Sequence, residues 1–135
     1  MSRENVEIVR RSFDLWRRGD VEGWLETIDP AIEWDISTHP LPDVPNRGSG
    51  REAFVTDMLA TYTSGWNDYS AELKEVSEAG EHVILVAHET ATMRDTGVPL
   101  ERDLVQLWTV QGGKAVFLRV FRTRAEALEA AGLRE

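Results

Sequence analysis

Cysteine is absent from the 135 residues of this sequence. Its absence excludes a disulfide framework and any site that needs a thiolate, and it fits a reducing compartment, so we expect a cytoplasmic protein. Long apolar runs are absent too. None approaches the ~20 residues that cross a bilayer, and Ser2-Arg3-Glu4-Asn5 does not begin a signal peptide. We therefore expect no membrane partner.

Positive charge is scarce, with 15 Lys and Arg against 24 Asp and Glu and a formal net charge of −9. Nucleic-acid binding needs an excess of Lys and Arg to neutralise phosphates, so this balance argues against a nucleic-acid partner. The partners that we expect are small molecules or other protein chains. The length suits one domain with its own core, spanning residues 1–135.

The stretch from His82 to Arg122 predicts three long strands joined by two tight turns. Residues 83–93, 100–110 and 115–122 are rich in apolar and β-branched side chains, and the breaks between them contain glycine. Glycine adopts the positive φ of tight hairpin turns without steric cost, so these breaks are typical of β-hairpins. One face of such a sheet must be covered, and only the upstream residues can supply the helices.

Apolar residues recur at helical spacing in three upstream segments and alternate with polar residues in two others. We predict helices over 3–18, 20–28 and 50–64, strands over 32–36 and from 69 to a turn at 79–80, and a loop over 37–50. Thr123 and Glu126 fit a capping box that begins a short C-terminal helix ending at Gly132. The expected fold class is α+β: a curved antiparallel or mixed sheet wrapped as a cone over three N-terminal helices, with a cavity at its open end.

Several of these segments also resemble a known family. The segments that carry the resemblance are Asn5–Phe13, Arg18-Gly19-Asp20, Asp29–Trp34, Gly50-Arg51-Glu52-Ala53, and Leu107–Lys114 followed by Arg119-Val120-Phe121. They are similar to SnoaL-like proteins of the nuclear-transport-factor-2-like superfamily, over nearly the whole chain. The resemblance implies a cone-shaped fold with a deep apolar pocket and, commonly, a homodimer formed through the outer sheet face.

That superfamily includes ketosteroid isomerases, polyketide cyclases, epoxide hydrolases, dehydratases and proteins that only bind ligands, so the fold alone does not choose an activity. The resemblance implies a pocket for a small, largely apolar molecule. Three functions stay open: proton-transfer chemistry of isomerase, cyclase or lyase type without a cofactor, binding without turnover, and a dimerisation module with a vestigial cavity. For the dimer contact we expect outward residues of the long strands, with Val105, Leu107, Leu118 and Val120 as candidates.

Asp35 is the first candidate for a catalytic group, because the resemblance to ketosteroid isomerases sets it at the position of their carboxylate base. Burial of such a carboxylate beside an apolar pocket favours proton abstraction next to a carbonyl. Trp34 and Asp35 point to opposite sides of an ideal strand, however, so both face the cavity only if the strand bends. Anchoring the comparison on Trp34 moves the base position to Ile36, and the alternative for Asp35 is a solvated surface carboxylate.

Three further residues are candidates for catalysis. His88 lies inside a predicted strand and can act as acid or base near pH 7; Asp103 on the next strand is a possible partner. Gln106 takes the place of the isomerases' protonated acid and could donate a hydrogen bond to a substrate oxygen. Arg119 alternates with apolar residues and needs an acid or a ligand carboxylate as partner. The alternative for His88 is that it and Glu89 straddle the sheet, one lining the pocket and the other lying in a dimer contact, and the alternative for Arg119 is a structural ion pair.

The remaining candidates are residues that could form the wall or mouth of an aromatic pocket. They are Trp16, Trp34, His39, Phe54, Met58, Trp66, Trp108 and Phe121. We expect no metal, because His39, His82 and His88 lack the spacing of metal ligands and no carboxylate cluster accompanies them. No cofactor is expected either.

Overall fold

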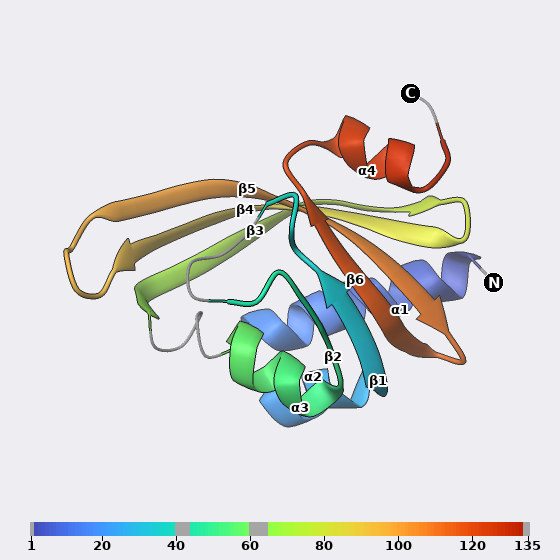
Figure 1. The fold of residues 1–135 in the computed structure, drawn as a ribbon, viewed down its shortest axis with the longest axis horizontal. Coiled ribbons are helices and arrows are strands. Elements are labelled where there is room, and N and C mark those ends of the chain that lie inside the picture. Colours follow the sequence, from blue (N-terminus) through green and yellow to red (C-terminus); the bar gives the residue numbers. More distant parts are fainter. Residues whose placement is uncertain (1, 40–43, 60–64, 134–135) are drawn as a thin grey trace.

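The computed structural model describes residues 2–39, 44–59 and 65–133. Its elements, in chain order, are α1 (Ser2–Arg17), α2 (Val21–Glu26), β1 (Ile28–Asp35), β2 (Arg47–Ser49), α3 (Arg51–Phe54), the π-helical segment η1 (Val55–Leu59), β3 (Trp66–Ala79), β4 (His82–Met93), β5 (Pro99–Gln111), β6 (Lys114–Phe121) and α4 (Arg124–Ala130). The six strands form one mixed, curved sheet in the order β2-β1-β6-β5-β4-β3 (Figure 1). Only β1 and β6 run parallel; the other neighbours are antiparallel.

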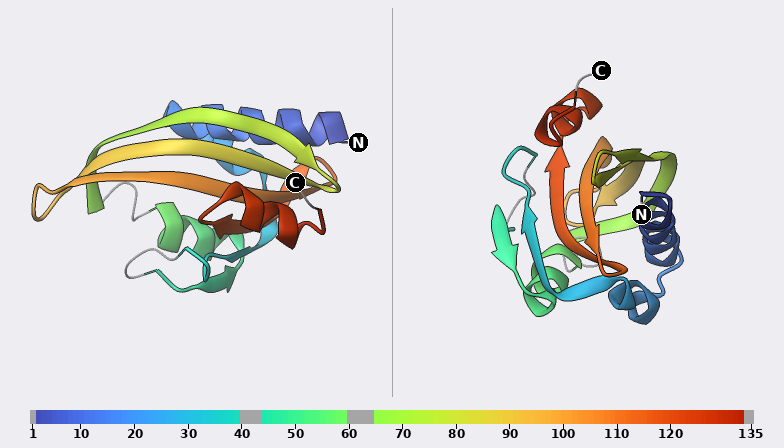
Figure 2. Two further views of the ribbon diagram at one scale, coloured as in Figure 1. Left: turned by 90° about the horizontal axis from the view of Figure 1, so that it is seen from above. Right: turned by 90° about the vertical axis from the view of Figure 1, so that its right-hand side faces the viewer.

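Helices cover the two faces of this sheet unequally. On the inner face, α1 contacts β3, β4 and β5, and Leu85, Leu104 and Leu118 join the main core. On the outer face, α4 contacts β4, β5 and β6 and covers a smaller apolar cluster. The end-on view shows the sheet curling around the side that carries α1 and α2, with α4 on the opposite side (Figure 2). The predicted α+β fold, with N-terminal helices and a short C-terminal helix, is confirmed.

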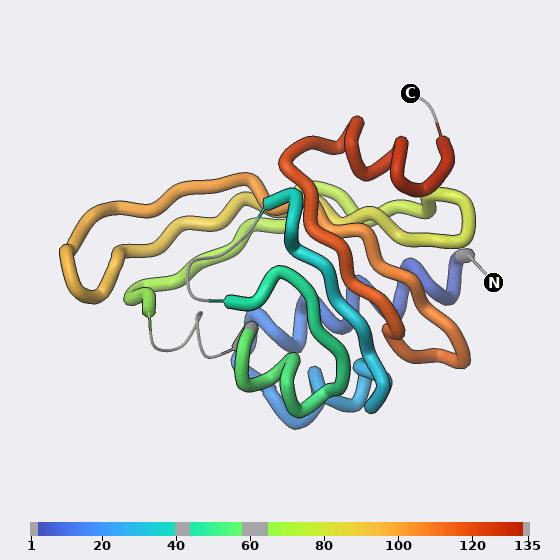
Figure 3. Tube along the Cα trace, in the orientation of Figure 1, coloured from blue at the N-terminus to red at the C-terminus, as the bar shows by residue number. Residues whose placement is uncertain are grey.

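The long strands follow the hairpin pattern of the sequence. β3 and β4 reverse at one end of the molecule, and β4 and β5 reverse at the other (Figure 3). Gly112 and Gly113, in the turn before β6, have φ values of 58° and 80°, as the hairpin prediction requires. β3 begins at Trp66, three residues before the predicted start, and its pairing with β4 is irregular at two points.

The second helix is shorter than predicted, because α2 ends at Glu26 and β1 begins at Ile28. Ile28 is fully buried and pairs with Ala115 of β6, so the sheet takes a residue that the helical pattern assigned to α2. Pro30 lies inside β1 rather than ending a helix. A strand tolerates it there because the pairing of β1 with β6 is interrupted between Ile28 and Glu33.

The predicted loop over 37–50 contains a short strand, β2, which pairs with the end of β1. Gly48 faces Trp34 in this pairing, and a Cβ atom built on Gly48 would lie 2.3 Å from Cζ2 of Trp34. Only glycine therefore fits against this indole. The predicted helix over 50–64 is seen as α3 and η1 up to Leu59, and residues 60–64 lie outside the described part of the chain.

The outer face of the sheet does not expose the residues that were expected to form a dimer contact. Val105 and Leu107 do lie on it, but α4 packs Ala127 onto the same cluster and both are buried within the chain. Leu118 and Val120 point to the inner face and belong to the main core. The four residues named for the dimer contact are thus not available for it, and that prediction is corrected.

Candidate functional site

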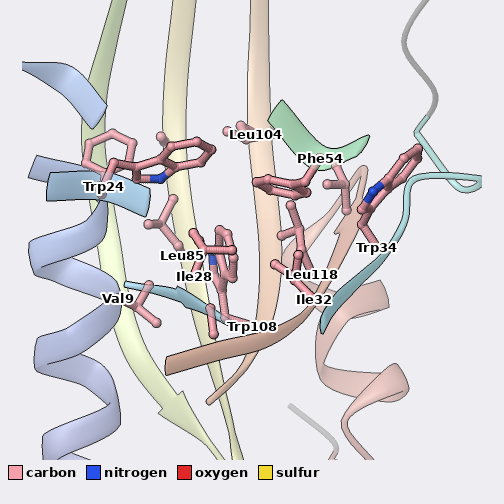
Figure 4. Close-up of a cluster of buried hydrophobic side chains, with 14 of the residues drawn as sticks. Val9, Trp24, Ile28, Ile32, Trp34, Phe54, Leu85, Leu104, Trp108 and Leu118 are labelled. Atoms are coloured by element: carbon pink, nitrogen blue, oxygen red, sulfur yellow. The ribbon is translucent and has the colours of Figure 1, made fainter. Parts of the chain in front are cut away.

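A pocket opens between the inner face of the sheet and the helices above it. Its volume is about 60 Å³, and most of its wall is apolar. The wall consists of Val9, Ser12, Phe13 and Trp16 of α1, Trp24 of α2, Phe54 of α3, Tyr69 of β3, Leu85 and Glu89 of β4, Leu104, Gln106 and Trp108 of β5, and Leu118 of β6. Figure 4 shows Phe54 above Leu118, with Trp24 on the side of the helices and Leu85 and Trp108 on the strands.

Aromatic rings from three helices form the helical side of this pocket. The ring centroids of Trp16 and Trp24 are 5.0 Å apart, and those of Trp24 and Phe54 are 5.5 Å apart in a stacked arrangement. Rings at such distances attract one another beyond the area that they bury. The helices therefore present an aromatic, apolar wall to the pocket.

Glu89 is the carboxylate in this wall. Its side chain is only 1% exposed, and alternation along β4 puts it on the inner face with Leu85. The hydroxyl of Tyr69, on the neighbouring strand, donates a hydrogen bond of 2.5 Å to Oε2 of Glu89. A carboxylate taken out of water needs such donors to stay ionised. A potential acid–base group is thus held at the edge of an apolar space.

Arg102 supplies the opposite charge. It faces Glu89 across the β4–β5 ladder, and its Nε lies 3.2 Å from Oε1 of Glu89. The contact is a charge pair rather than a directed hydrogen bond, and the Arg102 side chain is 13% exposed. Arg102 is not part of the pocket wall. Arg102 therefore lies beside the carboxylate and outside the pocket, whereas Glu89 and Tyr69 line the pocket.

Two other polar side chains reach the pocket with defined orientations. The indole N–H of Trp108 donates to Oε1 of Gln106 at 2.9 Å, which leaves the amide NH₂ of Gln106 as its donor end. The second is Ser12, which lines the pocket and whose Oγ lies 3.1 Å from the Thr27 hydroxyl. The Thr27 hydroxyl also lies 2.6 Å from the Trp24 carbonyl oxygen. The pocket therefore offers hydrogen-bond donors as well as a carboxylate.

Of the residues predicted for the site, four line this pocket: Trp16, Phe54, Gln106 and Trp108. Their contacts with a ligand stay a prediction. The side chain of Met58 lies outside the described part of the structure.

Asp35 lies away from the pocket. The strand is regular at this end, so Trp34 points inward and Asp35 outward, which answers the question that the sequence left open. Asp35 accepts hydrogen bonds from the hydroxyl and the backbone N–H of Ser37, and its Oδ2 lies 3.1 Å from Nε of Arg47. Burial alone would raise the pKa of Asp35, but the Ser37 hydrogen bonds and the Arg47 charge outweigh it and hold the pKa below its ordinary value. These contacts fix the chain as it leaves β1.

His88 also faces outward. Its Nδ1 lies 2.8 Å from Oδ1 of Asp103, the partner that the sequence suggested, and its Nε2 lies 3.4 Å from Oε1 of Glu101. The hydrogen bond to Asp103 raises the pKa of His88, and the Glu101 charge adds to this. The pair is real, but it sits on the face of the sheet opposite the pocket, next in the chain to the inward Glu89.

Arg119 and Phe121 share the outer face. The guanidinium carbon of Arg119 lies 5.3 Å from the centroid of the Phe117 ring. Among the described residues, no acid pairs with Arg119 and its Nε has no hydrogen-bond partner, so the predicted ion pair is not found. Phe121 packs against the α4 cluster, and its carbonyl oxygen lies 3.4 Å from Nδ1 of His39.

The other predicted wall residues are core. Trp34 is 1% exposed, and it lies far from Val9 and Trp24 in the cluster, against β2 (Figure 4). Trp66 is 6% exposed and stacks on Tyr69 with centroids 5.9 Å apart. Trp66 thus supports the pocket through Tyr69 rather than lining it.

Sequence reasoning did not name Tyr69 or Arg102 as site residues, and it considered Glu89 only in the alternative in which either His88 or Glu89 lines the pocket. One signal could have found Glu89. Val83, Leu85, Ala87 and Ala91 occupy alternate positions of β4, and Glu89 falls in the same apolar phase. A carboxylate in that phase must be buried and paired.

A second, more open hollow of about 340 Å³ lies between the first turns of α1 and the turn joining β3 to β4. Its lining includes Asn5, His82 and Thr109, and it has no aromatic wall. Burial and the Arg119 charge lower the pKa of His82, whose Nδ1 lies 2.9 Å from Oγ1 of Thr109.

Within the described residues, no group of three or more potential ligands could hold a metal ion. No helix in this described part of the chain has the length and apolar character needed to cross a membrane.

Comparison with known proteins gives one family. The model of the SnoaL-like domain matches residues 9–118. No significant match was found among the curated proteins.

Solved structures share the fold over nearly their whole length. An NTF2-like protein from Burkholderia thailandensis is 27% identical with a TM-score of 0.74, covering 98% of this chain and 96% of that one. A candidate SnoaL-like polyketide cyclase from Jannaschia sp. CCS1 is 22% identical with a TM-score of 0.72, covering 97% and 92%. A protein of ketosteroid isomerase-like fold from Catenulispora acidiphila, in complex with trimethylamine, is 15% identical with a TM-score of 0.68, covering 94% and 93%.

Proposed function

Because the chain belongs to the SnoaL-like domain family, we propose that its pocket binds a small, largely apolar carbonyl compound and moves a proton on it without a cofactor. One observation carries this proposal: the nearly inaccessible carboxylate of Glu89 lies in a mostly aromatic and aliphatic wall. Burying a charge is costly and adds little net stability, so a retained buried acid in a cavity favours a functional role.

The reaction follows from the neighbours of Glu89. Its carboxylate takes a proton from the carbon next to the carbonyl, the C–H electron pair forms a carbon–carbon double bond, and the carbonyl π pair moves to the oxygen to give an enolate. Once Glu89 is protonated it attracts the Tyr69 hydroxyl less strongly, so that O–H can turn to the enolate oxygen. In a β,γ-unsaturated ketone the enolate is conjugated with the second double bond, and return of the proton from Glu89 to the γ carbon completes an isomerisation to the α,β-unsaturated ketone. Asp35, His88 and Arg119 take no part in this scheme, since they lie on the other face of the sheet.

The test is proton exchange at the carbon beside a carbonyl. Acetophenone is incubated with the protein in D₂O, and loss of the α-proton signal is followed by NMR. We expect Glu89→Gln to lower the catalysed exchange by at least ~10²-fold, the usual size of a general-base contribution. Glu101→Gln is the matched control, because that side chain is 71% exposed on the outer face. Exchange that is equally fast in Glu89→Gln would refute the role of Glu89.

A second candidate function is binding without turnover. It is favoured by the contacts of Glu89 with both Tyr69 and Arg102, because each carboxylate oxygen already has a partner within the protein. This candidate predicts that ketones raise the melting temperature while their α-protons exchange no faster than in buffer. The same two measurements therefore separate it from the catalytic proposal.

A further inference from the structure

The two best-defined polar groups of the pocket lie at opposite ends of it. Gln106 faces Leu85 across the β4–β5 ladder, and Leu85 precedes Glu89 by four residues on β4. At a rise of ~3.3 Å per residue, the backbone positions of Glu89 and Gln106 are about 13 Å apart along the sheet. Both side chains nevertheless line the same pocket.

Contacts hold each of these two side chains near its own backbone position. Glu89 is held by Tyr69 and by Arg102, its direct partner on β5. Gln106 is held by Trp108, which lies two residues further along β5 and away from Arg102. Neither side chain is therefore free to swing toward the middle of the pocket.

The floor between the two ends is apolar. Leu85 and Leu104 line it, and Ala87 is fully buried beneath it. A pocket that reaches both Glu89 and Gln106 within about 60 Å³ must be long and narrow. Pockets for bulkier, drug-sized ligands span ~300–1,000 Å³, so a globular or fused-ring ligand does not fit this one.

We propose that the pocket selects a slender molecule with a polar group at each end and an apolar middle. The end at Glu89 carries a hydrogen-bond donor or an acidic C–H, because a carboxylate only accepts. The end at Gln106 carries an acceptor such as a carbonyl, which the free NH₂ of the amide binds. This inference rests on the proposed function, since it describes the substrate of the same site.

The test compares probes that differ in length and in their end groups. The long probe is 4-acetyl-4′-hydroxybiphenyl; 4-hydroxybiphenyl and 4-acetylbiphenyl each lack one end, and 4-hydroxyacetophenone has both ends on one ring. Affinities come from calorimetry and from quenching of tryptophan fluorescence. We expect the long probe to bind about tenfold more tightly than each of the others, because a missing partner leaves a buried polar group unpaired.

Variants test whether the acetyl end of the long probe lies at Gln106. Gln106→Leu should bring the affinity of the long probe down to that of 4-hydroxybiphenyl and leave 4-hydroxybiphenyl unchanged, while Gln111→Leu, an exposed residue of the same strand, changes neither. Equal affinity for long and short probes in the wild-type protein would overturn the inference, and this comparison needs no variant to fold. If Glu89-dependent proton exchange persists alongside that result, the inference fails and the proposed function stands.

Discussion

The hydroxyl of Tyr69 donates a hydrogen bond of 2.5 Å to Oε2 of Glu89, joining the edge strand β3 to β4 on the inner face of the sheet. Trp66 stacks on the Tyr69 ring from the same strand. The phenol is thus held from one side by an indole and from the other by a buried carboxylate.

Replacing Tyr69 by Phe should lower the free energy of unfolding by about 1.5–3 kcal/mol, the cost of losing a hydrogen bond to a buried charge. Urea denaturation followed by circular dichroism measures this. Ser77→Ala is the control, because that hydroxyl binds the partly exposed Glu75 on the same strand, and its loss should cost about 1 kcal/mol or less. Equal losses in the two variants would contradict the importance of the Tyr69–Glu89 bond.

Gly48→Ala should destabilise the protein by about 2 kcal/mol or more, since overpacking a core usually costs 1–3 kcal/mol. The added Cβ would lie 2.3 Å from the Trp34 ring, which is itself 1% exposed and has no room to retreat. Gly65→Ala serves as the comparison, because a Cβ there meets no atom within 4 Å. A thermal melt in which both variants match the wild type would show that the Trp34 contact is loose.

The three histidines should titrate in a fixed order. The Asp103 hydrogen bond raises the pKa of His88, whereas burial, aided by nearby arginines, lowers the pKa of His39 and His82. NMR titration of the imidazole protons should therefore show one histidine above 6.5 and two below it. In Asp103→Asn the high value should fall, and an unchanged titration would disprove the pairing.

The raised pKa of His88 also determines how the stability of the protein changes with pH. A group whose pKa is raised on folding contributes stability below its unfolded pKa, and this contribution disappears as pH rises through the folded pKa. The melting temperature of the wild-type protein should therefore fall relative to that of His88→Gln as the pH rises from about 6 to about 8. A difference that grows with pH would contradict this.

Asp35 should behave in the opposite sense. Its pKa is lowered on folding, so its contribution is present above the unfolded value of 3.8 and is lost as pH falls through the folded value. Asp35→Asn should therefore be less stable than the wild type at pH 7 and approach it near pH 3. Probe affinity and ketone exchange at pH 7 should be unchanged, because Asp35 lies on the outer face; a large loss of exchange would restore Asp35 as a catalytic candidate.

The secondary structure was predictable wherever a local rule determines it. The glycine turn before β6 and the capping box of Thr123 and Glu126 act within a few residues, and both are present in the structure. Ile28 was assigned wrongly because its pairing partner, Ala115, is far along the chain. β2 was missed for a similar reason, since Gly48 is placed by its packing on Trp34 rather than by strand propensity.

The residues of the candidate site were harder to predict because both faces of the sheet are apolar near α4. Ile84 and Val86 face outward and Leu85 and Ala87 inward, so the alternation of β4 does not say which phase faces the cavity. The sequence hypothesis chose His88 from this strand, and the inward residue is its neighbour Glu89. A shift of one position exchanges the two faces.

Helix α4 has a role that concerns handling of the protein rather than its ligand. Ala127 and Leu128 seal Ile84, Val105 and Leu107 from water. A chain truncated after Phe121 would keep every strand but expose an apolar patch on the sheet, and exposed apolar patches promote aggregation. Variants truncated before α4 should therefore aggregate during expression, even though no described residue of α4 lines the pocket.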